Sequence, residues 1–550
     1  GLGLERGARA AMLLPNCMEA VLFDQAVLAN ALTPVPLHAI DTPKSSAYIL
    51  NDSGAEILVT NKKLKWRQIR EAADLPNLRL VVITDDEFAD EPDAPIPMLS
   101  LETWLAKTPD APLPPGPRST DLAALVYTSG TTGNPKGVML THRNVLSNLR
   151  GVLGSLQPKS DDVLLSFLPL SHTFERTASY YMALGCGLTL AFNRSIANLQ
   201  EDLRTIRPSI LMSVPRVYDM IYGKLRDGLA KQTKLVQYLF DWAVEVGWRR
   251  ACRENGLPEE RTGRAWLDPI VAGFLDRKVG SKLRAVFGDR IHVYISGGAA
   301  LNPAVARVFL GLGVPIYQGY GMTETSPIIA VNRVGSNHPT TVGPALDNLE
   351  VRLSPEGELQ VRGPSVMRGY WHREEATRAI LSDDGWLSTG DVAEIYSDGH
   401  VRITGRIKEI IVTSSGEKVP PADLEAAIET DRLFDQTMAI GDDRPCIGLV
   451  AVVNGPEWER LCAELGLDPK DDAALRSREA TQAALRRVKA AASGFPNYGV
   501  PRVITLLREP WTIDNGLLTP TLKIKRAKVV ARYGAEIDAM YEAIAPKKKA

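Results

Sequence analysis

The chain contains 550 residues and has a mass of 60.0 kDa, which is more than one compact domain usually holds. Hydrophobic residues make up 45% of it and charged residues 23%, so disordered, collagen-like and disulfide-scaffold proteins are excluded. The 64 Lys and Arg residues balance 65 Asp and Glu residues. The resulting net charge of −1 argues against a nucleic-acid-binding protein, because neutralising phosphates needs a basic surface.

The first four hundred residues alternate short apolar runs with helical patterns, which predicts a parallel α/β sheet. Strands are expected at residues 10–14, 56–60, 80–84 and 291–296, and a charge-rich helix at 62–73. Because the strand at 10–14 follows Gly1 so closely, we expect that further residues precede Gly1 in the protein. The proline-rich stretch at 111–117 (APLPPGP) predicts a stiff connector.

The middle of the chain, residues 217–290, repeats apolar residues at intervals of three and four, which predicts a helical insertion packed on the core. The most apolar stretch, residues 180–192, has 13 residues, whereas a membrane span needs about 20. We therefore expect a soluble protein that at most rests on a membrane surface. The five cysteines form no C-x-x-C pair, which indicates reduced cytoplasmic thiols and no zinc site.

After about residue 345 the pattern changes to short strands separated by turns. Strands are expected at 350–353 and 358–362, and residues 397–400 form a turn between two strands. A smaller α/β unit begins past residue 405, where two prolines open a helix at 422–429. The lysine-rich tail at 547–549 is expected to be solvated.

The strongest motif is LVYTSGTTGNPKG at residues 125–137, where an apolar run leads into a loop of hydroxyl residues and glycines that ends in a lysine. Glycines let backbone N–H groups turn toward a phosphate, hydroxyls add donors, and a lysine adds charge. The spacing does not fit a Walker A loop. The candidate phosphate-binding residues are Thr128, Ser129, Gly130, Thr131, Thr132, Gly133 and Lys136.

This loop resembles the first signature of the adenylate-forming superfamily, which includes acyl-CoA synthetases, luciferases and nonribosomal adenylation domains. Four further segments resemble the remaining signatures in the expected order. They are YQGYGMTETSP at 317–327, GWLSTGD at 385–391, GRIKEIIVTSSGEKVPPADLE at 405–425 and TPTLKIKR at 519–526. The resemblance extends over nearly the whole chain.

The second signature supplies groups suited to a nucleotide. Tyr320 can stack on adenine beside Gly321, and Thr323 can bond the α-phosphate. Glu324 offers a carboxylate oxygen to Mg²⁺, which prefers oxygen ligands, and the resemblance adds the Thr128 hydroxyl to that metal site. Taken alone, the hexapeptide YGMTET could equally be a plain turn.

Further candidate residues follow from the other segments. The resemblance implies that Gly298 and Ala299 line the adenine and that His172 lies between the nucleotide and acyl sites. Asp391 is suited to the ribose hydroxyls and Arg406 to the ribose or the phosphates. A packed structural histidine and a structural ion pair are the alternative interpretations of these three polar residues.

The C-terminal signatures concern the two catalytic steps. By resemblance, Lys523 reaches the bridging oxygens between carboxylate and α-phosphate, although Leu522 replaces the glycine usual before it and leaves Lys525 as an alternative. The resemblance also implies a hinge at Lys408 and a glycine at Gly416 that lines the approach of the thiol.

The resemblance implies an α/β fold with a large multi-layer N-terminal adenylate-forming domain, residues 1–405, and a small mobile α+β C-terminal domain, residues 409–550. The section at 217–290 resembles that of long-chain acyl-CoA synthetases, and its helices could either wall a tunnel for an alkyl chain or simply pack on the core. The implied reaction is activation of a long-chain fatty acid by ATP and Mg²⁺, followed by transfer of the acyl group to CoA.

Two alternatives within the enzyme class stay open: a fatty acyl-AMP ligase that loads a carrier protein, and a CoA ligase for medium-chain or aryl acids. A nucleotide-binding protein without catalysis is disfavoured, because all the phosphate-handling residues are present. The expected partners are a fatty acid, ATP and CoA, without nucleic acid. The expected location is the cytoplasm, with peripheral membrane association as an option.

Overall fold

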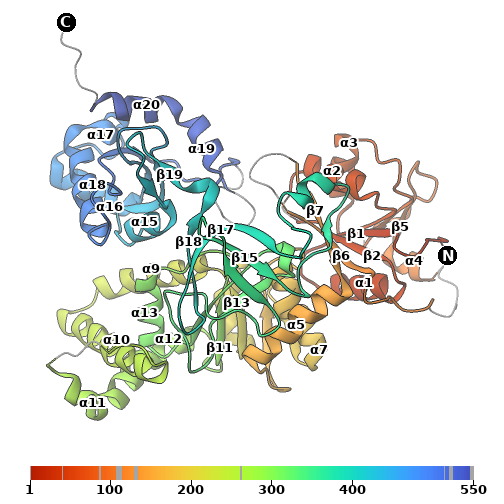
Figure 1. The fold of residues 1–550 in the computed structure, drawn as a ribbon, viewed down its shortest axis with the longest axis horizontal. Coiled ribbons are helices and arrows are strands. Elements are labelled where there is room, and N and C mark those ends of the chain that lie inside the picture. Colours follow the sequence, from red (N-terminus) through yellow and green to blue (C-terminus); the bar gives the residue numbers. More distant parts are fainter. Residues whose placement is uncertain are drawn as a thin grey trace, which may run out of the picture. The chain divides into compact units, whose positions relative to one another are not determined.

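The computed structural model describes residues 2–39, 41–85, 88–106, 114–128, 134–259, 263–512, 515–518 and 524–544. The chain divides into two units. Unit 1 comprises Gly1–Arg352, Gln360–Thr389 and Ile395–Arg402, and unit 2 comprises Leu353–Leu359, Gly390–Glu394 and Ile403–Ala550. The fold is therefore mixed α/β with a large N-terminal part and a separate C-terminal part, as the sequence predicted (Figure 1).

Unit 1 begins with a parallel five-stranded sheet in the order β2-β1-β3-β4-β5. Its strands are β1 (Arg9–Leu13), β2 (Thr33–Pro36), β3 (Ile57–Thr60), β4 (Leu80–Ile83) and β5 (Met98–Ser100), and its helices are α1 (Met18–Ala29), α2 (Pro43–Ser53), α3 (Lys63–Ala72) and α4 (Leu101–Ala106). The predicted strands at 10–14, 56–60 and 80–84 and the helix at 62–73 are confirmed to within one residue. These strands could be predicted from the sequence because β3 and β4 are buried along their whole length, which requires continuous apolar runs.

A second sheet has the order β13-β12-β11-β10-β8-β9, with β13 antiparallel to β12. Its strands are β8 (Val163–Ser166), β9 (Thr189–Phe192), β10 (Ile210–Ser213), β11 (Val293–Ser296), β12 (Ile316–Gly321) and β13 (Ile328–Val331). Helical segments around it are α5 (His142–Leu156), α6 (Thr173–Glu175), the π-helix η1 (Arg176–Tyr181), α7 (Met182–Cys186), η2 (Ile196–Asn198), α8 (Leu199–Ile206), α13 (Pro303–Gly311) and η5 (Thr323–Thr325). β11 begins two residues later than the predicted strand, where its pairing with β10 starts.

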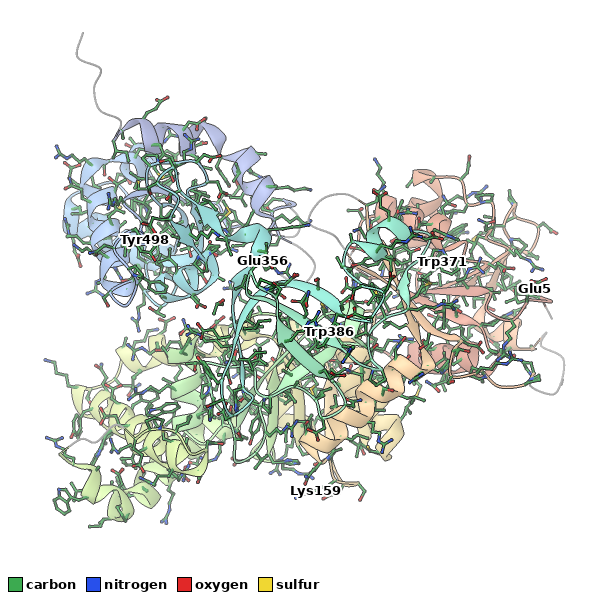
Figure 2. The ribbon with its side chains drawn as sticks, in the orientation of Figure 1. Glu5, Lys159, Glu356, Trp371, Trp386 and Tyr498 are labelled. Carbon is green, nitrogen blue, oxygen red and sulfur yellow. The ribbon has the colours of Figure 1, made fainter. Side chains whose placement is uncertain are left out.

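A third, three-stranded sheet carries the loop of the first signature. β6 (Leu122–Thr128) and β7 (Lys136–Thr141) form an antiparallel hairpin, and β16 (Gly369–Tyr370) adds antiparallel to β7. Trp371, labelled in Figure 2, follows β16, and its indole N–H donates to the Asp52 carbonyl of α2 at 3.1 Å. The short helix α14 (Glu374–Arg378) comes next.

The predicted insertion at 217–290 is confirmed as helical. It contains α9 (Pro215–Ala230), α10 (Lys234–Glu254), η3 (Ala265–Leu267), α11 (Asp268–Leu275), the π-helix η4 (Asp276–Gly280) and α12 (Ser281–Val286). Its inner face packs on the second sheet through edge-to-face aromatic contacts of Tyr218 and Phe287 with Tyr294 of β11. α10 lies so close to α13 that a Cβ at Gly247 would be 1.7 Å from the Gly311 oxygen. These inner side chains are core, and the alkyl tunnel stays a prediction.

Unit 2 is an α+β arrangement, and the chain passes between the units within each of the strands β14 (Glu350–Leu353), β15 (Glu358–Arg362), β17 (Leu387–Ile395) and β18 (Val401–Arg406). Beyond the 3-10 turn η6 (Ile407–Glu409) follow a hairpin of β19 (Ile411–Val412) and β20 (Lys418–Val419) and the sheet β21-β22-β23 (Phe434–Ile440, Gly448–Val453, Val503–Leu507). The helices are α15 (Pro421–Ile428), α16 (Gly455–Leu465), α17 (Asp472–Arg476), α18 (Arg478–Ala491), α19 (Arg526–Arg532) and α20 (Gly534–Glu542). The predicted strands at 350–353 and 358–362 are confirmed, and the predicted helix at 422–429 lies one residue earlier.

Among the residues described, none of the helices combines the length and the apolarity that crossing a bilayer requires. Residues 111–113 of the predicted connector and the lysine-rich tail at 547–549 lie outside the described residues.

Candidate active site

The β6–β7 hairpin positions the two ends of the first signature. Thr128 is the register partner of Lys136, so the hydroxyl and the ammonium group lie on the same face where the hairpin opens into its loop. The five predicted loop residues between these ends, Ser129, Gly130, Thr131, Thr132 and Gly133, lie outside the described residues. The described ends alone place a cation and a hydroxyl side by side.

Tyr370 of β16 links the first and second signatures, and the sequence analysis missed it. In the register of β16 with β7, Tyr370 lies opposite Val138 and therefore on the face of Lys136. The Lys136 Nζ lies 5.1 Å from the centroid of the Tyr370 ring, within cation–π range. The Tyr370 hydroxyl donates to Glu324 Oε1 at 2.6 Å. A positive and a negative side chain from distant motifs thus contact the same tyrosine, one over its ring and the other at its hydroxyl.

The electrostatics of this arrangement keep Tyr370 a hydrogen-bond donor. Burial raises the pKa of Tyr370, and the adjacent Glu324 carboxylate raises it further. Glu324 itself is buried within η5, and its carbonyl accepts from the Met367 N–H at 2.8 Å. A held carboxylate and a nearby ammonium group that do not neutralise each other directly can receive a metal ion and a phosphate. The only clear signal for Tyr370 in the sequence was the aromatic GYW run.

The carboxyl ends of β11 and β12 bring the adenine-site candidates to one edge of the second sheet. These strands are parallel neighbours, with Ser296 opposite Gln318, so the segments that follow them emerge together. Gly298 has a φ of +84°, which favours glycine. Gly321 allows a close backbone approach, because a Cβ there would lie 2.0 Å from the Pro327 oxygen. Tyr320 precedes it at a bulge in the pairing with β13.

Helix α6 connects His172 to both of these segments. The His172 side chain caps α6, with Nδ1 accepting from the Phe174 N–H at 3.3 Å. The Phe174 ring fills the space beside Gly297, the residue before Gly298. Thr173 Oγ1 lies 3.5 Å from Thr323 Oγ1. The histidine segment is therefore packed against the second signature, as a residue between two substrate sites would be.

Glu175, at the end of α6, is a buried titratable group that no motif indicated. Its side chain is completely covered, and burial raises its pKa to about 8. It forms no ion pair among the described residues. At neutral pH the carboxyl is thus mainly protonated, whereas Asp24 forms an ion pair with Arg176 of η1.

The fourth signature and Asp391, the last residue of the third, belong to unit 2. Arg406 Nε donates to Asp391 Oδ1 at 2.9 Å, which realises the ion pair considered as an alternative for these residues. Asp391 is buried and Arg406 is about half exposed. Lys408 is exposed within η6, and Gly416 has a φ of +82° in the β19–β20 hairpin loop. Lys523 lies outside the described residues.

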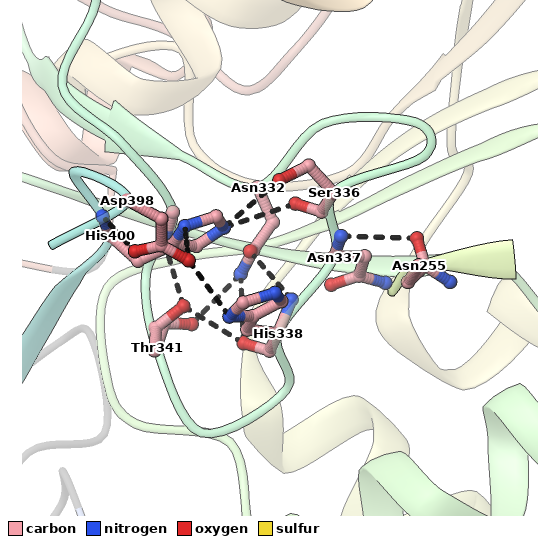
Figure 3. Close-up of polar contacts among 9 residues, drawn as sticks. Asn255, Asn332, Ser336, Asn337, His338, Thr341, Asp398 and His400 are labelled. Atoms are coloured by element: carbon pink, nitrogen blue, oxygen red, sulfur yellow. Dashed lines mark hydrogen bonds and ion pairs between the residues drawn. The ribbon is translucent and has the colours of Figure 1, made fainter. Parts of the chain in front are cut away.

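One polar cluster in unit 1 has no counterpart in the sequence analysis (Figure 3). His338 and His400 stack with ring centroids 3.9 Å apart and an angle of 8° between the planes. Asp398 Oδ2 lies 3.1 Å from His400 Nδ1 and 3.8 Å from His338 Nδ1. On its other side, the His400 ring is held by Ser336, whose carbonyl oxygen lies 3.2 Å from Nε2.

The stacking of the two histidine rings is unfavourable for chelating an ion. An imidazole lone pair lies in the ring plane, so two parallel rings do not direct both Nδ1 lone pairs at one metal. Burial and the neighbouring His400 lower the pKa of His338, while the hydrogen bond from the His400 backbone lowers the pKa of Asp398.

Known protein families and individual relatives match nearly the whole chain. The family model described as AMP-binding enzyme matches residues 1–371, and the model described as AMP-binding enzyme C-terminal domain matches residues 408–545. A long-chain-fatty-acid–CoA ligase of Mycobacterium bovis is 32% identical over 562 residues, covering 98% of this chain and 89% of that protein. The peroxisomal long chain acyl-CoA synthetase 7 of Arabidopsis thaliana is 30% identical over 578 residues, covering 99% and 79%.

A solved structure shares the fold. The adenylation domain of carboxylic acid reductase from Segniliparus rugosus, in complex with AMP and a co-purified carboxylic acid, superposes with a TM-score of 0.73. The two chains are 24% identical, and the match covers 99% of this chain and 84% of that one.

Proposed function

Because the chain belongs to the AMP-binding enzyme family, we propose that it activates a long-chain fatty acid with ATP and transfers the acyl group to CoA. In the first step a carboxylate oxygen attacks the α-phosphorus of ATP, and the bond to pyrophosphate breaks. In the second step the CoA sulfur attacks the acyl carbon, and AMP leaves.

The observation that carries this proposal is that Lys136 and Glu324 both contact Tyr370, Lys136 over the ring and Glu324 at the hydroxyl. Adenylate formation gathers negative charge on the phosphates, and a preorganised cation stabilises it as it develops. The buried Glu324 carboxylate and the Thr128 hydroxyl are oxygen donors of the kind that Mg²⁺ prefers, so both fit a magnesium site. When bound, Mg²⁺ would supply further charge neutralisation at the phosphates.

The remaining nucleotide contacts are proposals for individual residues. Tyr320 stacks on the adenine beside Gly298 and Ala299. Asp391 accepts from the ribose hydroxyls, and its pairing with Arg406 orients the carboxylate for them. His172 separates the nucleotide from the acyl group, and its hydrogen bond from the α6 backbone supports a fixed ring orientation.

The acid and the acceptor are tested together by one assay. AMP release is measured with saturated fatty acids of graded length, with and without CoA. The proposal predicts kcat/KM that climbs with each methylene and reaches a plateau at long chains, because each buried CH₂ contributes about 0.8 kcal/mol. Preference for acetate or benzoate would overturn the long-chain assignment. Acyl transfer to a carrier protein without transfer to CoA would show that the carrier protein is the acceptor.

The two steps are proposed to use different arrangements of the C-terminal domain. Lys523 serves adenylation and Gly416 lines the approach of the thiol, so the chain turns at Lys408 between the steps, as hinge motions allow. Lys523→Ala should abolish adenylate formation yet still convert supplied acyl-adenylate and CoA to thioester. Lys408→Pro, which restricts φ, should do the reverse. Equal loss of both steps in both variants would contradict the two arrangements.

A further inference from the structure

Helix α11 and the turn before it carry an apolar stripe that faces outward. Trp266, Ile270 and Phe274 are spaced four residues apart and are 70%, 72% and 55% exposed. At a rise of about 1.5 Å per residue the stripe is about 12 Å long. Large apolar side chains exposed together on one helix face indicate an interaction surface.

α11 is fixed to α10, so the apolar stripe has a defined position on the surface of unit 1. Arg249 of α10 binds Asp268, the first residue of α11, through two hydrogen bonds of 2.6 and 2.7 Å. Both side chains are buried, and Leu275 at the other end of α11 is buried as well. The helix is thus fixed on α10 by its inner side, at the edge of unit 1 (Figure 1).

The stripe continues onto the start of α10. Leu235 and Tyr238 are exposed there, and the Arg264 guanidinium donates to the Tyr238 hydroxyl. This bond ties the segment before Trp266 to the first turn of α10. The outward surface therefore combines aliphatic side chains with one tryptophan and one tyrosine, whose rings suit the boundary between water and lipid.

On the segment that carries the stripe, residues 263–282, the exposed charged side chains are basic. Arg264, Arg277, Lys278 and Lys282 are all exposed. The two acidic residues between positions 263 and 282 are engaged in ion pairs, Asp268 with Arg249 and Asp276 with Arg284. The cations are thus left to attract an anionic partner.

We propose that this surface, formed by Trp266, Ile270, Phe274 and the adjacent cations, docks the protein on an anionic lipid bilayer. Apolar side chains on one face of a helix with Lys and Arg beside them are the pattern of an interfacial helix. Side chains that protrude this far enter a fluid interface without a complementary pocket. A second copy of the chain is disfavoured as the partner, because it would bring two sets of cations together. The inference goes beyond the proposed function, since neither reaction step requires a membrane.

Co-sedimentation with lipid vesicles tests the proposal. The full chain is mixed with vesicles of pure phosphatidylcholine or with vesicles in which a third of the lipid is phosphatidylglycerol. Binding is expected to the anionic vesicles and to weaken with salt, since each basic residue near such a surface strengthens partitioning about fivefold. Trp266→Ser/Phe274→Ser and Arg277→Glu/Lys278→Glu should each weaken binding by about tenfold or more.

A matched control distinguishes vesicle binding through this surface from nonspecific binding through exposed apolar side chains. Leu22→Ser/Leu64→Ser removes two exposed leucines on α1 and α3 of the same unit and should leave vesicle binding unchanged. Absence of wild-type binding to anionic vesicles overturns the proposal, even if the protein is captured by polyglutamate, which would indicate an acidic protein partner. Equal weakening by the control overturns it too. Adenylation of fatty acid in detergent solution should be unchanged in all three variants, so a failure of the proposed function is distinguishable.

Discussion

Two buried carboxylates of unit 1 are surrounded by the same kinds of groups in different arrangements. Asp24 of α1 accepts from the Tyr180 hydroxyl at 2.9 Å, and Glu324 of η5 accepts from the Tyr370 hydroxyl at 2.6 Å. Each also has a cation close to a tyrosine ring, Arg176 in the first case and Lys136 in the second. The difference is that Arg176 pairs with Asp24 directly, whereas, among the described residues, Lys136 and Glu324 are linked only through Tyr370, which Lys136 contacts over the ring and Glu324 at the hydroxyl.

The comparison separates charges that hold the fold from charges that serve a reaction. A buried ion pair that is closed on itself has little left to offer a ligand, and breaking it exposes an uncompensated charge to a low dielectric. A cation and a carboxylate that contact a shared tyrosine without pairing directly retain their capacity to bind opposite charges of a substrate. Substitutions in the first cluster should therefore change stability, and substitutions in the second should change turnover.

The largest effect is expected for Arg176→Ala. It leaves Asp24 buried and unpaired, which should lower the free energy of unfolding by about 3–5 kcal/mol. Urea unfolding measures this, with the exposed pair partner Arg378 changed to Ala as the control, where a change below about 0.5 kcal/mol is expected. A loss of similar size in both variants would remove the distinction between the two clusters.

Lys136→Ala and Glu324→Gln should lower activity while leaving stability nearly unchanged. Each is expected to reduce fatty-acid-dependent ATP–pyrophosphate exchange by about 100- to 1,000-fold, because each removes a preorganised charge at the phosphates. Their unfolding free energies should stay within about 1 kcal/mol of wild type, since neither breaks a direct ion pair. Wild-type exchange with normal Mg²⁺ dependence would contradict the assigned site.

Glu175 extends the comparison to a buried carboxyl without a cation. Its pKa is raised from 4.5 to about 8, so between these values the folded protein holds a proton that the unfolded chain releases. The contribution of this proton to stability is complete below the pKa of Glu175 in the unfolded chain. It is lost as the pH rises through the pKa of Glu175 in the folded protein. Glu175→Gln should flatten that dependence and gain on the order of 2 kcal/mol at alkaline pH. Unchanged pH profiles of urea unfolding would show that Glu175 ionises normally.

Tyr370→Phe tests the contribution of the tyrosine hydroxyl separately from that of the ring. The variant keeps a ring face for Lys136 and removes the hydrogen bond to Glu324, a bond to a charged group worth about 1.5–3 kcal/mol. We expect about a tenfold loss of exchange activity and a higher Mg²⁺ requirement. Tyr498→Phe, at an exposed tyrosine of unit 2, is the matched control and should behave as wild type. An equal effect of both changes would rule out a positioning role.

The smallest effect concerns His338. Its pKa lies below the ordinary value of 6.5, so the folded state takes up a proton less readily than the unfolded chain does. Stability should therefore fall as the pH drops below 6.5, by about a few tenths of a kcal/mol for a partly exposed ring. His338→Asn should show a shallower decline in thermal unfolding across this range. A steeper decline would reverse the assigned direction.

The sequence predicted the parts of the active site but not how they meet. Lys136 and Glu324 belong to recognisable signatures, so each could be assigned from its own motif. Tyr370 could not, because it reaches them through the pairing of β16 with β7, and strand pairing between distant segments is not encoded locally. The assignments of Ser129 and Lys523 stay predictions, since both residues lie outside the described part of the chain.

The insertion shows the same limit for surfaces. Its apolar spacing correctly predicted helices, but α11 has apolar residues on both sides, with Leu275 buried and Ile270 exposed. A pattern of that kind does not tell which side faces the core. The Asp24–Arg176 pair was likewise unpredictable, because nothing near either residue signals the other.

The register of β7 has a consequence for anyone who alters the length of this segment. Gly137 faces the side opposite to Lys136, where a Cβ would already lie 3.0 Å from Leu125 and Tyr127. One residue inserted between Lys136 and Val138 would exchange the two faces of the strand against its fixed neighbours, and two inserted residues would restore them. Tolerance of insertions here should therefore alternate between odd and even lengths, and homologues that differ in the length of this hairpin should differ in steps of two.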